Sequence, residues 1–166
     1  MKTKQITQLG LLLSISLVLG YLESLLPVIV AVPGVKLGIA NIVTMLVLYN
    51  MGGKQAFLIM LLRVVIAGFL YSGVAGILYS FMGGVCCIVV MTWLRRVPIF
   101  SILGVSMIGA VFHNAGQIMA AVLVMENTDV IYYLPLLCIS GVLSGLSVGF
   151  LSHFLIKWYS QNFPED

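Results

Sequence analysis

The chain has 166 residues, of which 61% are hydrophobic and 8% are charged, and its formal net charge is +3 at pH 7. A polypeptide this apolar cannot keep most of its surface in water, so a soluble globular fold is excluded and an integral membrane protein is expected. In such a protein the positions of the basic residues indicate orientation, and the small net charge is no sign of nucleic-acid binding.

Six apolar runs, separated by short polar breaks, follow one another along the chain. A membrane-spanning helix needs about 20 mainly apolar residues, and the runs cover roughly residues 8–30, 36–51, 55–71, 74–94, 101–125 and 131–157. Most of the breaks are short enough to join only antiparallel neighbours. The sequence therefore predicts an all-α fold, a six-helix transmembrane bundle that forms one domain over residues 1–166.

The first run follows Lys2 and Lys4, a pattern that a secretory signal peptide shares. It is too long for a signal peptide and lacks a small-residue cleavage site, so we expect it to be retained. Small residues recur along it at helical spacing, at Gly10, Ser14, Ser16 and Gly20. Such a face packs against the rest of the bundle or against an external partner, and both alternatives stay open here.

The stretch PGVKLGIAN, residues 33–41, separates the first run from the second. Pro27, Pro33 and Gly34 break helical continuity just before Lys36. We expect the chain to leave the helix here and to re-enter the membrane near Leu37. Lys36 would then lie at the mouth of a pocket that this loop covers.

Two later runs carry small residues on one face. In the fifth run, Ser106, Gly109, His113 and Gln117 fall on one stripe at alternating three and four spacing, which we expect to face inward, with Asn114 partly aside. In the sixth run, Gly141, Gly145 and Gly149 form a doubled GxxxG ridge. Because such ridges allow helix backbones to approach closely, we expect this one to pack inside the bundle.

Basic residues mark one side of the predicted bundle. If six helices alternate in direction, the same side carries Lys2, Lys4, Lys54, Arg95, Arg96 and Lys157. Basic residues collect in cytoplasmic segments, so we predict a multi-pass protein of the cell membrane, embedded in the lipid bilayer, with both termini in the cytoplasm.

A few polar residues lie within the apolar runs or beside them. A polar side chain at membrane depth is costly unless it faces the protein interior, so each is a candidate for function. We predict a substrate-binding role for Glu23, Lys36, Asn41, Arg63, His113, Asn114 and Gln117. At about 1.5 Å per residue, most of them share the outer half of the membrane. Two cations against one acid favour an anionic or zwitterionic small molecule.

Structural roles are the alternatives for the same residues. The long side chain of Arg63 can reach a helix terminus or the cytoplasmic interface along hydrocarbon. Glu23 and Lys36 can form an ordinary ion pair that pins the first loop to the bundle. For His113 and Gln117, one helical turn apart, we favour a contact with the ligand.

The sequence offers little support for catalysis or metal binding. Its two aspartates, Asp129 and Asp166, are too far apart to form a pair that binds magnesium diphosphate. The GGK of residues 52–54 lacks the rest of a nucleotide-binding loop. Cys86, Cys87 and Cys138 lack the spacing of a zinc site. We therefore expect a protein that is not an enzyme and that holds neither metal nor cofactor.

A family resemblance rests on residues spread along the chain: Glu23, Pro27, PGVKLGIAN at 33–41, GGK at 52–54, Arg63, GVSMIGAVFHNAGQ at 104–117 and YLP at 133–135. Together they resemble the bacterial Gx transporter family, which is also labelled heptaprenyl diphosphate synthase component I. The size and six-helix plan are also similar to the substrate-binding S components of energy-coupling factor transporters. That similarity implies a first helix that docks on a transmembrane coupling subunit driven by two ATPases. Gly10, Ser14, Ser16 and Gly20 would then form the docking face, although they do not match an AxxxA pattern clearly.

Two functions follow from the two family labels. The first hypothesis is an S-component-like subunit that captures a small anionic or zwitterionic compound from outside and needs a separate ATP-driven module. The alternative is a non-catalytic accessory subunit of heptaprenyl diphosphate synthesis, with a prenyl synthase subunit as its partner. A purely structural membrane scaffold leaves the polar residues unexplained.

Overall fold

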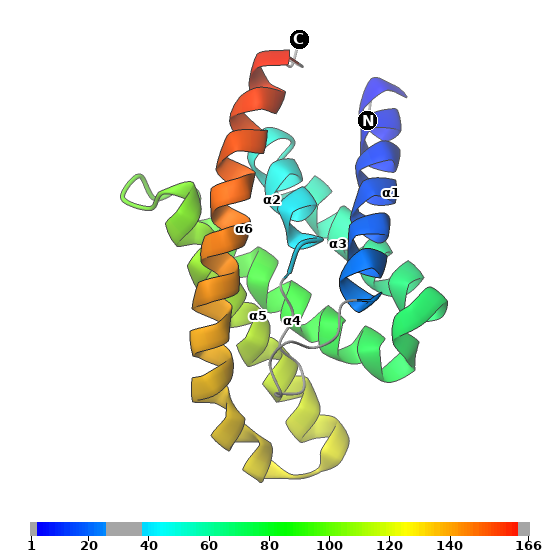
Figure 1. Cartoon of the computed structure of the whole chain (residues 1–166), viewed down its shortest axis with the longest axis vertical. Coiled ribbons are helices and arrows are strands. Elements are labelled where there is room, and N and C mark those ends of the chain that lie inside the picture. The colour runs from blue at the N-terminus through cyan, green and yellow to red at the C-terminus, as the bar shows by residue number, and fades with distance from the viewer. Residues whose placement is uncertain (1–2, 26–37, 163–166) are drawn as a thin grey trace.

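The computed structural model describes residues 3–25 and 38–162, and its regular secondary structure in these ranges is entirely helical. The helices are α1 Thr3–Leu25, α2 Asn41–Asn50, α3 Gly53–Ala67, α4 Gly73–Leu94, α5 Ile102–Met125 and α6 Leu134–Asn162. A π-helical turn, η1 (Gly68–Ser72), continues α3 into α4, and a 3-10 helix, η2 (Thr128–Tyr133), leads into α6. The described chain therefore forms five continuous helical runs (Figure 1).

Four of these runs are long and apolar enough to cross a membrane: Thr3–Leu25, Gly53–Leu94, Ile102–Met125 and Thr128–Asn162. The fifth is α2, whose ten residues make a helix about 15 Å long, half the roughly 30 Å of a bilayer's hydrocarbon core. The all-helical fold is confirmed, and the four long runs fit a membrane protein. The predicted second span, 36–51, is helical only from Asn41 in the described part, so six spanning helices stay a prediction.

The longest run, Gly53–Leu94, reverses direction at η1. Figure 1 shows α3 and α4 packed as the two arms of a hairpin with η1 at its corner. The corner ends at Gly73, whose φ of 72° lies in the left-handed region that a glycine adopts without a steric penalty. The break that the sequence predicts between residues 71 and 74 is therefore a tight helical corner.

The shortest α-helix of the described ranges, α2, lies at the centre of the bundle. All seven residues from Ile42 to Leu48 are buried, and α2 contacts α1, α3 and α6. In Figure 1 it lies between α1 and α6. A helix that is apolar on every side is stable only when neighbours enclose it, which explains why the sequence around α2 shows no polar face. By contrast, the outer faces of α1 and α6 expose large apolar side chains such as Leu11 and Leu143, as a lipid-facing surface does.

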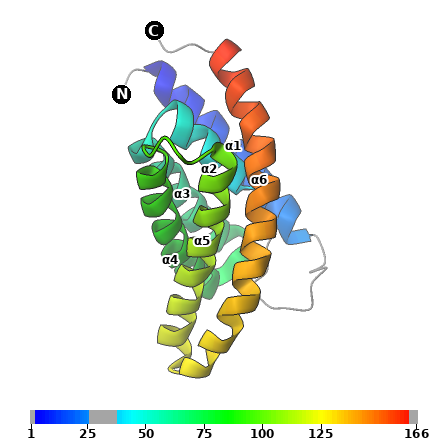
Figure 2. The same cartoon turned by 90° about the vertical axis from the view of Figure 1, so that its left-hand side faces the viewer.

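Glycines set the distance between α4, α5 and α6. A Cβ atom on Gly116 of α5 would lie 2.6 Å from the carbonyl oxygen of Met82 on α4. A Cβ on Gly145 of α6 would lie 2.7 Å from the Cα of Met107 on α5. The predicted inward packing of the ridge Gly141, Gly145 and Gly149 is thus confirmed, because all three glycines lie against α5. Figure 2 shows α5 and α6 side by side, extending beyond the other helices at the end away from the termini.

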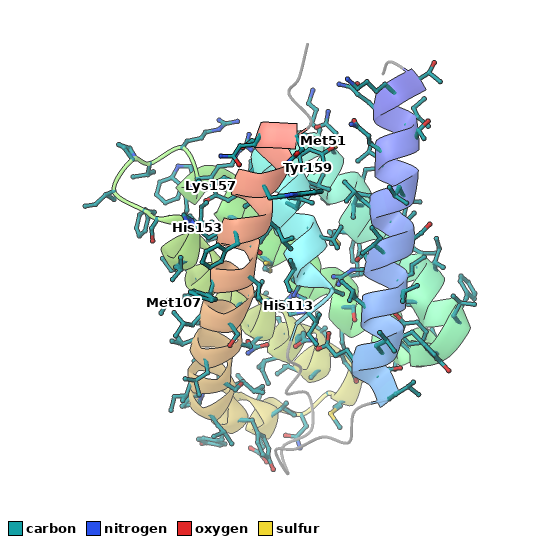
Figure 3. The ribbon with its side chains drawn as sticks, turned by 45° about the horizontal axis from the view of Figure 1, so that its top comes forward. Met51, Met107, His113, His153, Lys157 and Tyr159 are labelled. Carbon is teal, nitrogen blue, oxygen red and sulfur yellow. The ribbon has the colours of Figure 1, made fainter. Side chains whose placement is uncertain are left out.

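In the described ranges, the basic residues other than Arg63 lie at the end of the bundle where α1 begins and α6 ends. Figures 1 and 2 show the start of α1 and the end of α6 there, and Figure 3 labels Lys157 and Tyr159 close to Met51, in the turn after α2. The guanidinium of Arg95, which follows α4, donates a hydrogen bond to the carbonyl oxygen of Leu48 near the end of α2. A cation at a helix C-terminus is stabilised by the partial negative charge of the last carbonyl groups.

This contact predicts a difference between two adjacent arginines. We expect Arg95→Ala to lower the free energy of unfolding by about 1–2 kcal/mol, since it removes a charged hydrogen bond to the carbonyl group of the buried Leu48. The neighbouring Arg96 is exposed, so Arg96→Ala should change it by less than about 0.5 kcal/mol. Thermal unfolding of both variants in the same detergent measures the difference. Equal losses would contradict the role given to the Arg95 contact.

Candidate functional site

Arg63 connects α3 to the start of α2. Its Nη2 donates a hydrogen bond to Oδ1 of Asn41, the first residue of α2, at 2.9 Å. Glu23 and Tyr71 lie near enough to act electrostatically on the guanidinium. The sequence left two structural alternatives for Arg63. In the structure its side chain reaches a helix terminus, the start of α2. It lies apart from the end of the bundle where the other basic residues of the described ranges gather.

Glu23, near the end of α1, holds the backbone just before α2. Its Oε1 accepts a hydrogen bond from the backbone N–H of Gly38 at 2.6 Å, and a bond to a carboxylate is among the stronger ones. Gly38 has a φ of 74°, which favours glycine. Glu23 therefore fixes the last turn of chain before α2. Lys36, its predicted partner, lies outside the described residues.

Tyr71, in the η1 corner, completes this group, and the sequence had indicated only a turn there. A Cβ on Gly20 would lie 2.7 Å from the Tyr71 hydroxyl oxygen. The Tyr71 ring also contacts Tyr21 edge-on, with ring centroids 5.8 Å apart. Four elements thus contribute to one polar cluster, which we call the Arg63 cluster: Glu23, Gly38, Asn41, Arg63 and Tyr71.

A small cavity of about 30 Å³ lies beside the cluster. Asn41 lines it together with Thr44 of α2, Cys87 of α4, Ser106 of α5 and Ser144 of α6. Apolar side chains such as Met45, Met91 and Val148 provide the rest of its wall. The inward position expected for Ser106 is confirmed, since it is buried. Thr44 was not among the predicted site residues because a single threonine within an apolar run gives no periodic signal.

The three predicted residues of α5 divide between two neighbouring helices. Asn114 donates its side-chain N–H to the backbone carbonyl of Leu137 on α6 at 2.6 Å. His113 and Gln117 lie against Gly83 of α4, where a Cβ would be 2.8 Å from the carbonyl oxygen of His113 and 2.9 Å from Cγ of Gln117. Figure 3 shows His113 near the middle of the bundle.

The residues predicted to form one binding pocket therefore lie in two separate places. Glu23, Asn41 and Arg63 come together in the Arg63 cluster, whereas none of His113, Asn114 and Gln117 lines the cavity. The expectation that Asn114 points aside from the other two is confirmed. Its bond to α6 is the kind of interhelical contact that holds a membrane bundle together.

The small residues of α1 also divide between the inside and the outside of the bundle. Ser16 is fully buried and donates its hydroxyl to the carbonyl oxygen of Ala40 at 3.3 Å, and Gly20 packs against Tyr71. Gly10 has no atom within 4 Å of an added Cβ, and Ser14 is exposed. Of the four predicted docking residues, only Gly10 and Ser14 face away from the bundle.

No metal site is built in the described part of the chain. Residues 3–25 and 38–162 contain no group of three or more His, Cys, Asp or Glu side chains that could hold a metal ion. Cys86, Cys87 and Cys138 are free thiols.

The chain matches a known protein family. The sequence pattern of the family described as heptaprenyl diphosphate synthase component I matches residues 12–155. The match begins within α1 and ends within α6, so it includes the Arg63 cluster, the cavity and the three polar residues of α5. Searches of curated proteins and of solved structures found no match.

Proposed function

The chain belongs to the family described as heptaprenyl diphosphate synthase component I, and we propose that within it the protein is a membrane substrate-binding subunit that captures a small anionic or zwitterionic compound. In this proposal it works like the S component of an ATP-driven uptake transporter and performs no chemistry itself. The binding residues would be Glu23, Lys36, Asn41, Arg63, His113 and Gln117, while Asn114 mainly joins α5 to α6.

The Arg63 cluster carries the proposal. Arg63 is ten residues beyond the start of α3, about 15 Å along the helix. A charge at that depth is costly, and charged groups inside membrane proteins commonly mark a ligand or ion pathway. Arg63 and Glu23 provide both signs of charge around Asn41. This arrangement favours a ligand with an anionic group, and a zwitterion would meet both charges.

The distribution of basic residues supports the membrane placement that this role requires. In the described ranges every basic residue except Arg63 is near the end that holds the termini, while Glu126 and Asp129 follow α5 at the opposite end. By the positive-inside rule the first end is cytoplasmic. The proposal therefore has both termini inside the cell, six membrane segments and the Arg63 cluster facing outward. Gly10 and Ser14 are the exposed small residues of α1 on which a transmembrane coupling subunit would dock.

A second candidate function comes from the family description. A component I of heptaprenyl diphosphate synthase would be an accessory membrane subunit that binds a prenyl synthase subunit or a prenyl diphosphate. Arg63 suits a diphosphate as well as it suits a carboxylate. The two candidates differ in their protein partners and in the length of the apolar part of the ligand.

Gentle extraction of tagged protein from its own membranes, followed by native mass spectrometry, separates the candidates. We expect a small polar compound to accompany the wild-type protein, together with coupling and ATPase subunits. Arg63→Met should reduce the bound compound at least about tenfold, the effect of losing about 1.4 kcal/mol of binding free energy. Arg96→Met, which changes an exposed arginine, is the matched control. A prenyl synthase or a prenyl diphosphate in place of these components would establish the second candidate, and retention of the compound by Arg63→Met would remove the site.

A further inference from the structure

The side-chain hydroxyl of Thr44 lies beside the cavity next to the Arg63 cluster and has no hydrogen-bond partner within the described ranges. Thr44 lines this cavity and is 4% exposed, and its Oγ1 is buried. A buried hydroxyl without a partner costs about 1–3 kcal/mol, whereas a valine would fill the same space without that cost. The position of the hydroxyl at the cavity wall therefore needs an explanation.

The polar groups in the wall of the cavity are all uncharged. Asn41, Thr44, Ser106 and Ser144 supply three hydroxyl groups and one amide from α2, α5 and α6. Arg63 and Glu23 are absent from its lining. An ion inside would have to leave water for a wall that is mostly apolar and carries no opposite charge, which is strongly unfavourable. The wall suits a neutral group that can both donate and accept hydrogen bonds.

The size of the cavity fits the same conclusion. A buried water molecule needs about 10–15 Å³ of such space and two to four polar partners. The cavity, at about 30 Å³, has room for about two water molecules. We infer that this cavity is a built site for one or two buried water molecules, which bond the Thr44 hydroxyl and connect α2 to α5 and α6. This inference does not depend on the proposed transport function.

The direction in which one substitution changes Tm tests the inference. Thr44→Val keeps the shape of the side chain and removes only its hydroxyl. If water bridges that hydroxyl, we expect Tm in detergent to fall by about 3 °C, the shift that about 1 kcal/mol produces in a chain of this size. Thr44→Ser keeps the hydroxyl and should retain the bridge. An unchanged or higher Tm for Thr44→Val would overturn the inference, because it would show a hydroxyl with no partner at all.

A double-mutant cycle and a control complete the test. We expect Thr44→Val and Ser106→Ala to be coupled, with a combined loss of Tm smaller than the sum of the single losses, because both act on the same water. Ser147→Ala is the control, since Ser147 is exposed and its hydroxyl bonds only to Leu143 in its own helix. Additive losses would overturn the bridge. In a crystal structure of the purified protein, separate density peaks within hydrogen-bonding distance of Thr44 Oγ1 would support water, and one elongated density would identify part of a ligand and overturn it.

Discussion

Replacing Glu23 by glutamine is expected to lower the free energy of unfolding by about 2 kcal/mol, because the hydrogen bond from the N–H of Gly38 then ends on a neutral amide oxygen instead of a carboxylate, and Arg63 loses a nearby negative charge. Glutamine keeps the size of the side chain and an oxygen that can accept from the N–H of Gly38. The loss of stability therefore measures the effect of removing the negative charge. Thermal unfolding of detergent-purified protein is the measurement. Glu126→Gln, at an exposed acid, is the control and should change stability by less than about 0.5 kcal/mol.

A second substitution distinguishes this cause from a general loss of packing. Adding Arg63→Met to Glu23→Gln removes the uncompensated cation, so we expect the double variant to recover about half of the lost stability. Further destabilisation in the double variant, with the two losses simply added, would show that the two side chains stabilise the fold independently. It would also remove the electrostatic basis of the Arg63 cluster.

The other large effect is expected at Gly116, where α5 crosses α4. A Cβ there would meet only backbone atoms, among them the Cα of Gly83 at 2.9 Å and the carbonyl oxygen of Met82. Backbone atoms cannot move aside without separating the helices, so Gly116→Ala should lower the free energy of unfolding by about 3 kcal/mol. Gly10→Ala adds the same methyl group where no atom lies within 4 Å, and alanine's better helix propensity should leave stability unchanged or raise it by up to about 1 kcal/mol. A Gly116→Ala variant as stable as Gly10→Ala would contradict the close approach of α4 and α5.

Much of the fold could be predicted because it follows from local patterns. The fifth predicted run, 101–125, differs by one residue from α5, Ile102–Met125. This start is also determined locally, since the hydroxyl of Ser101 accepts a hydrogen bond from the N–H of Gly104 and so caps the helix. The inward ridge of α6 was predictable for the same reason, because small residues at a spacing of four lie on one face whatever their surroundings.

For the candidate site, the sequence could predict which residues matter, but it could not predict which residues contact one another. That Glu23 and Arg63 matter follows from the cost of charge in an apolar run. That Glu23 holds the N–H of Gly38 depends on the path of the chain before α2, which no helical pattern describes. The separation of Asn114 from His113 depends on which neighbour each side of α5 faces. Pairings between elements distant in sequence therefore required the structure.

The enclosure of α2 also imposes an order on how the protein is made. A translocon passes into the lipid those segments that are long and apolar enough by themselves, and the ten residues of α2 are too few. Its wall includes α6, which leaves the ribosome after α1 to α5. The centre of this bundle is therefore completed only after α6 has been made, when α1 and α6 meet around α2.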